Sequence, residues 1–343
     1  MKSLNKYFFK SKKIPIDRFI AKVLYDKNYG YYSKKIPFGK HGDFITAPEI
    51  SFLFSEILAV WIVSLWEHLN KPKIFNIVEL GPGSGRMSAT LIRVFKKFPE
   101  FFKSTNISLY EKSRSLKNLQ KKNLFGQKIK WVKSYKSIKS GPVIFLGNEF
   151  FDAIPIKQYE KINNILYEKY VKLENNSKVK TFLKKTNLNI IKKLKKFNLF
   201  KDQSFIEFPK QGFEELDLIT STIKRLNGGL LLIDYGFLNQ ESKNTLQSVK
   251  NHKKNMLFDN LGNADITSLV NFNLLKTYFK KKNLKTNNVV TQEFFLKRMG
   301  IINRAELHSK KISFKEKSDI YYSLQRLLNP RQMGELFKVI FAF

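Results

Sequence analysis

The sequence predicts an α/β fold with a doubly wound, mainly parallel sheet, and three observations support this class. Residues 75–80 form a mostly apolar stretch that leads into a glycine-rich turn and then a helical pattern, which is the order of a buried strand, a tight turn and a helix. Apolar strands and amphipathic helices then alternate along the chain, as they do when crossover helices connect parallel strands. A last apolar stretch, residues 335–343, fits an antiparallel strand that completes such a sheet.

Composition limits the classes of function that are open. The chain has 343 residues, of which 43% are hydrophobic, enough for a large core. It contains no cysteine, which excludes disulfides, thiolate-bound zinc, iron–sulfur clusters and a cysteine nucleophile. The four histidines show no H-x-x-x-H pairing, so no metal site is expected.

The formal net charge is +35, from 63 Lys and Arg against 28 Asp and Glu. Such a charge is compatible with a nucleic acid or an acidic partner, but the lysines are dispersed, which favours a solubilising surface. No run of about 18 apolar residues is present, so we expect no membrane-spanning helix. The basic first residues lack an apolar signal core. We therefore expect a cytoplasmic protein in a bacterium, or a protein of the mitochondrial matrix if the source is eukaryotic.

Residues 1–71 are interpreted as an N-terminal helical lid or substrate element. Helical spacing of apolar residues covers 14–28, and a second predicted helix covers 50–69. The loop between them is long and rich in glycine and aromatic residues, which is typical of functional loops. The side chains that could close over a ligand are Tyr31, Tyr32, Asp43, Thr46 and Glu49. Alternatively, Asp43 and Thr46 hold the turn and Glu49 opens the next helix.

The predicted core covers residues 72–155 and 205–343. Its predicted strands are 75–80, 107–111, 128–133, 143–147, 228–236, 284–291 and 335–343, and its predicted helices include 86–98, 113–123, 211–226 and one that ends near 282. Loops are predicted at 99–103 and around 245–267. Residues 156–204 are interpreted as an insertion: an antiparallel meander over 156–184 with a hairpin turn at 175–177, then a poorly anchored tract over 185–203.

The turn after the first core strand predicts the cofactor. Glycines let the backbone approach a ligand closely, and the helix that follows begins with free N–H groups. A dinucleotide-binding turn would have glycine at Arg86, and a P-loop would end in Gly-Lys-Ser/Thr, which this turn does not. An acid followed by G-x-G-x-G is instead the pattern of proteins that bind S-adenosylmethionine (SAM), whose cationic amino-acid end suits a carboxylate. The residues concerned are Glu79, Gly81, Pro82, Gly83 and Gly85. The alternative is a tight turn with chance glycines.

Glu111 ends the second strand, where a doubly wound fold places an acid that binds the ribose hydroxyls. It lies further from the glycine turn than the roughly 20 residues typical of that rule, and the predicted loop at 99–103 explains the excess. The alternative is a solvated surface acid.

Two acids follow the fourth strand, which should lie beside the first, so that its carboxyl end faces the glycine turn. Glu149 and Asp152 flank paired aromatic residues, and carboxylates in this arrangement can hold a planar guanidinium by bidentate contacts. Methyl transfer needs alignment, a lone pair and a route for one proton, which these acids could supply for an arginine nitrogen. Asp152 could instead cap a helix. A methyltransferase that acts on nucleobases would carry prolines in this segment. Their absence weakens the hypothesis of a nucleobase substrate.

Five segments, taken together and in order, carry a family resemblance: residues 42–51 (GDFITAPEIS), 78–85 (VELGPGSG), 148–155 (NEFFDAIP), 232–236 (LIDYG) and 333–339 (MGELFKV). They resemble the MidA family, whose mitochondrial members are arginine methyltransferases that act as assembly factors of respiratory complex I. The resemblance covers about residues 14–343. It implies a class I SAM-methyltransferase fold, SAM as cofactor and an arginine of a complex I subunit as substrate.

Two short stretches, residues 84–86 and 133–134, depart from the family's pattern. The family usually carries Arg-Gly-Thr after Gly-Pro-Gly, where this chain has Ser84, Gly85 and Arg86. After the third strand the family tends to offer an Asp near the adenine, where this chain has Lys133 and Ser134. Because Ser134 can still form a hydrogen bond, we expect weaker adenine recognition at most. The expected cofactor contacts are thus Glu79, Gly81, Pro82, Gly83, Gly85, Glu111, Ser134, Asn148 and Thr46, and the expected catalytic residues are Glu149 and Asp152.

The favoured function is a SAM-dependent protein arginine N-methyltransferase that supports complex I assembly. The alternatives are a SAM-dependent RNA methyltransferase, which the +35 charge motivates, and a non-catalytic assembly chaperone that keeps the fold. A positive surface repels an arginine-rich peptide, so acids in the pocket would have to overcome that repulsion locally.

Overall fold

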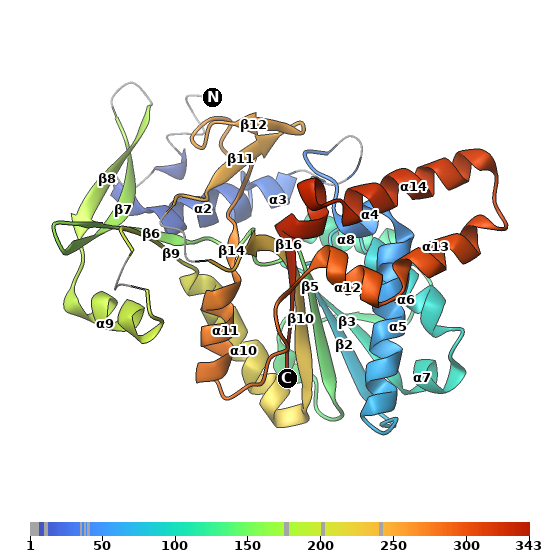
Figure 1. Cartoon of the computed structure of the whole chain (residues 1–343). Helices are drawn as coiled ribbons and strands as arrows, with labels where there is room; N and C mark the ends of the chain where they lie inside the picture. The colour runs from blue at the N-terminus through green and yellow to red at the C-terminus, as the bar shows by residue number, and fades with distance from the viewer. Residues whose placement is uncertain are drawn as a thin grey trace.

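An eight-stranded sheet forms the centre of the protein (Figure 1). The computed structural model describes residues 7–9, 13–34, 36–37, 39, 42–174, 178–199, 203–239 and 243–343. The strand order is β15-β16-β10-β5-β2-β3-β4, and β14 pairs with β10. The parallel strands are β2 (Phe75–Leu80), β3 (Thr105–Tyr110), β4 (Ile129–Trp131), β5 (Val143–Asn148), β10 (Gly228–Phe237) and β14 (Val270–Asn271). Antiparallel strands β16 (Phe337–Ala342) and β15 (Val290–Thr291) complete the sheet. The predicted fold class is confirmed.

Helices cover both faces of this sheet because alternate side chains of its strands point to opposite sides. In β2, Phe75 and Ile77 pack into one apolar cluster, whereas Val78 and Leu80 pack into another. The first cluster includes helices α5 (Phe52–His68), α6 (Arg86–Phe95), α12 (Gln292–Arg298), α13 (Ile301–Ser309) and α14 (Phe314–Leu328). The second includes α10 (Lys210–Leu226) and α11 (Phe272–Lys281).

The order of the strands places a crevice at one end of the sheet. β2 pairs with β3 on one side and with β5 on the other, so the direction of winding reverses between β2 and β5. Ligands of doubly wound sheets bind outside the carboxyl ends of the strands at such a reversal. Here the two strand ends lie in register, with Leu80 opposite Gly147. The glycine turn and the acids after β5 therefore meet at the crevice.

A second, antiparallel sheet joins the N-terminal segment to the insertion. Its order is β1-β7-β6-β9, with β8 on β7, and its strands are β1 (Lys13–Pro15), β6 (Lys157–Ile162), β7 (Ile165–Leu173), β8 (Val179–Lys185) and β9 (Phe205–Phe208). Helix α2 (Ile16–Tyr25) packs in the same apolar cluster as Ile156 and Val171. The predicted hairpin turn at 175–177 lies outside the described residues. Helix α5, grouped by sequence with the N-terminal lid, packs on the main sheet because apolar residues occupy most of its circumference.

Several local predictions are wrong. Residues 99–103 belong to a helix, α7 (Pro99–Ser104), which begins with proline at its first position. The tract 185–203 contains α9 (Leu188–Lys196) and is anchored by Leu194 and Leu199, which are buried. The long loop around 245–267 contains a three-stranded sheet, β12-β11-β13, formed by β11 (Gln247–Lys250), β12 (Lys253–Asn255) and β13 (Asp265–Thr267). Strands of three or four residues are too short for their periodicity to show in the sequence.

Short elements complete the chain. The predicted helix over 50–69 begins as α4 (Ala47–Ile50), and Ser51 then caps α5 by accepting a hydrogen bond from the Leu53 amide at 3.3 Å. The others are α3 (Tyr31–Lys34), α8 (Arg114–Asn123), the 3-10 turn η1 (Tyr135–Ser137) and the π-turn η2 (Pro330–Gly334). In the part of the chain that the structure describes, no helix is long and apolar enough to span a bilayer.

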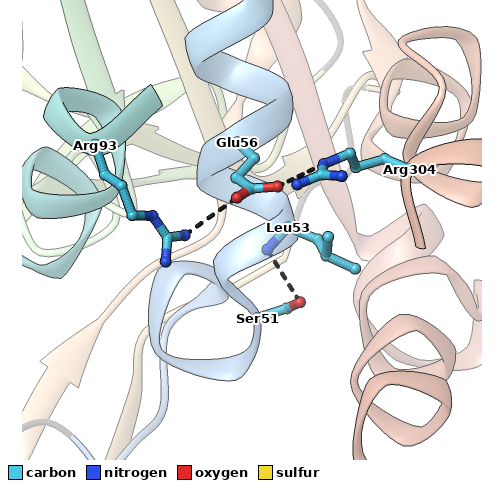
Figure 2. Close-up of polar contacts among 5 residues, drawn as sticks. All are labelled: Ser51, Leu53, Glu56, Arg93 and Arg304. Atoms are coloured by element: carbon cyan, nitrogen blue, oxygen red, sulfur yellow. Dashed lines mark hydrogen bonds and ion pairs between the residues drawn. The ribbon is translucent and has the colours of Figure 1, made fainter. Parts of the chain in front are cut away.

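Glu56 on α5 ties two other helices to the main domain (Figure 2). Its carboxylate contacts Arg93 of α6 at 3.1 Å and Arg304 of α13 at 2.7 Å, and its side chain is 8% exposed. We expect Glu56→Gln to lower the free energy of unfolding by about 1–3 kcal/mol, because two charge-assisted contacts are lost while both arginines can reach water. Chemical denaturation measures this change. Glu67→Gln, an exposed position on the same helix, is the control and should be neutral; equal stability of the two variants would contradict the assignment.

Candidate active site

A cavity of about 460 Å³ opens at the carboxyl ends of β2, β3, β5 and β10, within the size range of small-molecule sites. The N-terminal segment and the three-stranded sheet complete its wall. The predicted site residues that line it are Glu79, Gly81, Pro82, Gly83, Glu111, Asn148, Glu149, Asp152 and Thr46. Their grouping in one cavity is a finding of the structure, and their roles stay predictions.

The backbone of the glycine turn adopts a conformation that other residues resist. Gly81 and Gly83 have φ values of 60° and 55°, in the left-handed region that favours glycine. A Cβ at Gly81 would lie 3.1 Å from the Phe150 ring. Gly85 does not line the cavity: its Cβ would lie 2.9 Å from Leu124, and it precedes α6. Gly85 has φ of 82° at the start of α6, so the left-handed backbone, rather than contact with a cofactor, explains this glycine.

Glu79 and Glu111 both line the cavity beside this turn; Glu79 is buried and Glu111 is half-buried. Glu79 is 3% exposed, accepts a hydrogen bond from the Ser88 hydroxyl, and has a pKa raised by burial to about 8. Burial also raises the pKa of Glu111, whose oxygens accept hydrogen bonds from the Ser113 amide at 2.8 Å and from Gln120 at 3.3 Å. The same Gln120 amide donates to the Gly83 carbonyl at 2.9 Å. One buried side chain thus couples the glycine turn to Glu111.

Gln120 had no role in the sequence interpretation. A polar residue on the inward face of α8 could have indicated a role for Gln120. Its side chain is fully buried, and a buried amide needs hydrogen-bond partners.

The segment after β5 is held in a strained and well-defined conformation. Glu149 has φ of 50°, which is costly for a non-glycine residue and is often associated with functional sites. Its Oε1 accepts hydrogen bonds from the Ala47 amide at 3.2 Å and from Asn148 at 3.3 Å. Asp234 on β10 accepts hydrogen bonds from the amides of Phe151 and Asp152 at 2.8 and 3.2 Å. Residues 151–154 form turns, so Asp152 does not cap a helix.

Burial dominates the electrostatics of these acids. It raises the pKa of Glu149 to about 8, and the neighbouring charge of Asp152 adds to the effect. The pKa of Asp152 is raised by burial, against a side-chain hydrogen bond with Tyr235, and that of Asp234 is raised by burial and by Asp152. Among the described residues, no Lys or Arg lies within ion-pair distance of Glu149 or Asp152. A bound cation would relieve this concentration of buried negative charge.

The lid residues divide into two groups. Tyr32, Thr46 and Glu49 line the cavity. Tyr31 and Asp43 are buried behind it and bonded to each other at 2.6 Å, and Asp43 also accepts from the Asn251 amide at 2.6 Å. Asp43 therefore holds the loop, as the alternative interpretation expected.

Glu49 joins the lid to the glycine turn. Its carboxylate accepts a hydrogen bond from the Ser84 hydroxyl and pairs with Arg86 at 3.0 Å. Ser84 and Arg86 differ from the residues that the family usually carries, and both contact the same glutamate.

The second stretch that departs from the family's pattern contains Ser134, which was expected to contact adenine. Ser134 does not line the cavity: its exposed side chain accepts from the Lys136 amide at 3.3 Å at the start of η1, so the structure does not support a contact with adenine.

The donors and acceptors of the cavity fit SAM. Glu79 offers a carboxylate with no Lys or Arg within ion-pair distance among the described residues, and Glu111 offers one next to the turn. The Asn148 Oδ1 atom is buried and has no hydrogen-bond partner in the described structure, which indicates that a ligand donor is missing there. When bound, SAM supplies a methyl group on a sulfonium.

A parallel sheet with this order, and a cavity of this kind at its reversal point, define the class I SAM-dependent methyltransferases. The comparisons with known proteins specify the family. The family model "Putative S-adenosyl-L-methionine-dependent methyltransferase" matches residues 57–290. This chain belongs to that family, the MidA family of SAM-dependent methyltransferases.

Similar proteins cover nearly the whole chain. Protein arginine methyltransferase NDUFAF7 of Xenopus laevis is 29% identical over 367 residues, which covers 98% of this chain and 83% of that protein. The Caenorhabditis elegans homolog is 31% identical, over 80% of this chain and 70% of that protein. The crystal structure of a COG1565 superfamily member from Burkholderia thailandensis, bound to S-adenosyl-homocysteine, superposes with a TM-score of 0.84 at 23% identity and covers 99% of this chain and 90% of that one. This last similarity supports the fold.

Glu79 gives SAM binding a predictable dependence on pH. Its pKa of about 8 lies above its usual value of 4.5, so the proton must leave before the carboxylate can pair with the cofactor's ammonium group. We expect affinity to fall by up to about tenfold per pH unit as pH drops from 8 to 6. Calorimetry from pH 6 to 9 measures this. Glu79→Gln should bind more weakly and without that slope; an unchanged slope in the variant would assign the titration to another group.

Proposed function

We propose that this enzyme transfers the methyl group of SAM to a guanidino nitrogen of an arginine in a protein. The observation that carries the proposal is the concentration of carboxyl groups in the cavity of an otherwise basic protein, since a bound cation would favour their ionised forms. Against a net charge of +35, the acids that line the cavity are Glu49, Glu79, Glu111, Glu149, Asp152, Glu215 and Asp265. The bases in the described lining are Arg86 and Lys112, which pair with Glu49 at 3.0 Å and Glu215 at 3.1 Å. Such a site selects a cationic group and disfavours a phosphate.

Glu149 and Asp152 have the chemistry that the reaction needs. Their oxygens accept the N–H groups of a guanidinium and fix its plane, which directs one nitrogen toward the methyl group. With SAM bound, a nitrogen–carbon bond would form as the sulfur–carbon bond breaks, and the proton lost by the nitrogen would pass to a carboxylate of the cavity. Glu149 is the better acceptor of that proton, because burial makes it more basic than an ordinary carboxylate. The products are a methylated arginine and S-adenosyl-homocysteine.

The substrate is proposed by analogy with relatives named protein arginine methyltransferase NDUFAF7, mitochondrial. We infer an arginine on a subunit of respiratory complex I, modified during assembly, in the cytoplasm of a bacterium or in the mitochondrial matrix of a eukaryote. An acidic surface around the target arginine would complement the positive surface of the enzyme.

RNA is the second candidate substrate, because the +35 charge would attract a polyanion. The acidic cavity weighs against it. A non-catalytic chaperone role would not require the strained, buried Glu149.

Incubation with isotopically labelled SAM and either purified complex I subunits or total RNA tests the proposal. We expect label in protein, on arginine after hydrolysis. Label that appears only in RNA would overturn the arginine assignment, and SAM binding without any transfer would favour the chaperone.

A further inference from the structure

Asp265 is a buried acid on the cavity wall that belongs to none of the five family segments. It lies on β13, in the three-stranded sheet where the sequence pattern predicts a loop, and is 3% exposed. The Tyr32 hydroxyl contacts its two oxygens at 3.2 and 3.4 Å, and the Ile266 amide donates to Oδ1 at 2.9 Å. The carboxylate is therefore fixed in orientation before any ligand binds.

The backbone joins Asp265 to the acids after β5. The Ser268 amide, just past β13, donates to the Asp152 carbonyl at 3.1 Å. The rings of Tyr25 and Tyr32 stack at 5.4 Å with 15° between their planes, and the Tyr25 hydroxyl donates to the Ala153 carbonyl at 2.7 Å. One end of this aromatic pair thus contacts Asp265 and the other contacts the residue after Asp152.

One carboxylate oxygen in this group lacks a partner. Asp152 is 7% exposed, it lines the cavity, and its Oδ1 has no hydrogen-bond partner in the described structure. A buried acceptor left without a donor is costly, so the atom indicates where a ligand donor belongs. Burial, followed by the charge of Asp152, raises the pKa of Asp265 to about 8. Among the described residues, Asp265 has no Lys or Arg within ion-pair distance.

We propose that Asp265 is a third carboxylate of the substrate subsite and that, with the Tyr25–Tyr32 pair, it selects an arginine side chain over a lysine. The proposal rests on the proposed arginine methyltransferase function. A guanidinium has five N–H donors in one plane and a flat face that stacks on aromatic rings, whereas an ammonium has three donors and no such face. Carboxylates from β13 and from the segment after β5, together with the stacked tyrosines, match the first group. They leave one nitrogen for the methyl group while the other donors are held.

The test compares Asp265→Asn with the wild-type enzyme on a peptide that contains one arginine and on the same peptide with lysine. We expect Asp265→Asn to raise KM for the arginine peptide by about tenfold or more, to change kcat less, and to reduce the preference for arginine over lysine. SAM affinity, measured by calorimetry, should stay within about twofold of wild type, which also shows that the variant is folded. Tyr32→Phe keeps the ring and removes the hydroxyl, so a smaller rise in KM is expected. The control is Asp259→Asn, an exposed acid in the loop before β13, which should behave as wild type.

The outcomes separate this proposal from the function on which it rests. If the wild-type enzyme methylates the arginine peptide and Asp265→Asn has an unchanged KM and preference, only the role of Asp265 is overturned. If the wild-type enzyme does not methylate arginine in any peptide or complex I subunit, the proposed function is overturned and this subsite with it.

Discussion

Glu149→Gln is expected to lower kcat for methyl transfer by about 10²–10⁴-fold while SAM binding stays within about twofold of wild type. A glutamine oxygen can still accept the hydrogen bonds that Glu149 Oε1 accepts from Ala47 and Asn148, so the fold should persist. What the variant loses is the negative charge that holds the guanidinium and accepts its proton. Single-turnover rates and calorimetry measure the two quantities.

Stability provides an independent check on this variant. The pKa of Glu149 is about 8 when folded against an ordinary value of 4.5, so the folded state holds a proton that the unfolded state releases between these values. The contribution of Glu149 to the free energy of unfolding therefore decreases as pH rises from 4.5 to 8. Above pH 8, Glu149→Gln should melt at a higher temperature than the wild-type protein, because it has no buried charge there. Glu306→Gln, exposed on α13, is the control for both measurements. Turnover that survives in Glu149→Gln would remove Glu149 from the reaction.

Gly83→Val is expected to weaken SAM binding by about a hundredfold or more, because a β-branched residue resists the left-handed backbone of a turn that lines the cavity. Gly83 has φ of 55° and its carbonyl accepts the Gln120 hydrogen bond. A shift of this backbone would also disturb Glu111. Equilibrium binding of SAM by calorimetry measures the loss.

The matched control is Gly126→Val. Gly126 has φ of 76°, and a Cβ there would meet no atom of the described structure within 4 Å. Both variants therefore carry similar backbone strain, but only Gly83 lines the cavity. If the two variants lose SAM affinity equally, the loss comes from general destabilisation and the turn has no special role in binding.

The core of the fold could be predicted because its strands are buried on both faces. β2, β5 and β10 read as apolar runs bounded by glycine, and the structure reproduces each within about a residue or two. The prediction failed for elements that depend on distant partners. β12 has the sequence KKN and β13 the sequence DIT, which carry no period of their own and become strands only by pairing with β11.

The same distinction explains which residues of the site could be predicted from the sequence. Glu79 lies near the end of β2, and Glu111 and Glu149 follow β3 and β5, so the topology of the sheet determines where these acids lie. Asp265 lies on the three-stranded sheet, which the sequence does not predict. Gln120 matters because its buried amide donates hydrogen bonds to Gly83 and Glu111. Neither residue could be placed in the site before the tertiary structure was known. Asp234 belongs to a segment that carried the family resemblance, but its role as an acceptor for two backbone amides appears only in the structure.

We propose that the enzyme methylates an arginine of respiratory complex I. Mass spectrometry of the complex, purified from cells that contain the wild-type protein, lack it, or carry Glu149→Gln, tests that claim most directly. The account predicts a methylated arginine on one subunit in the first case and the unmodified residue in the other two. Identical arginine methylation in all three preparations would contradict it.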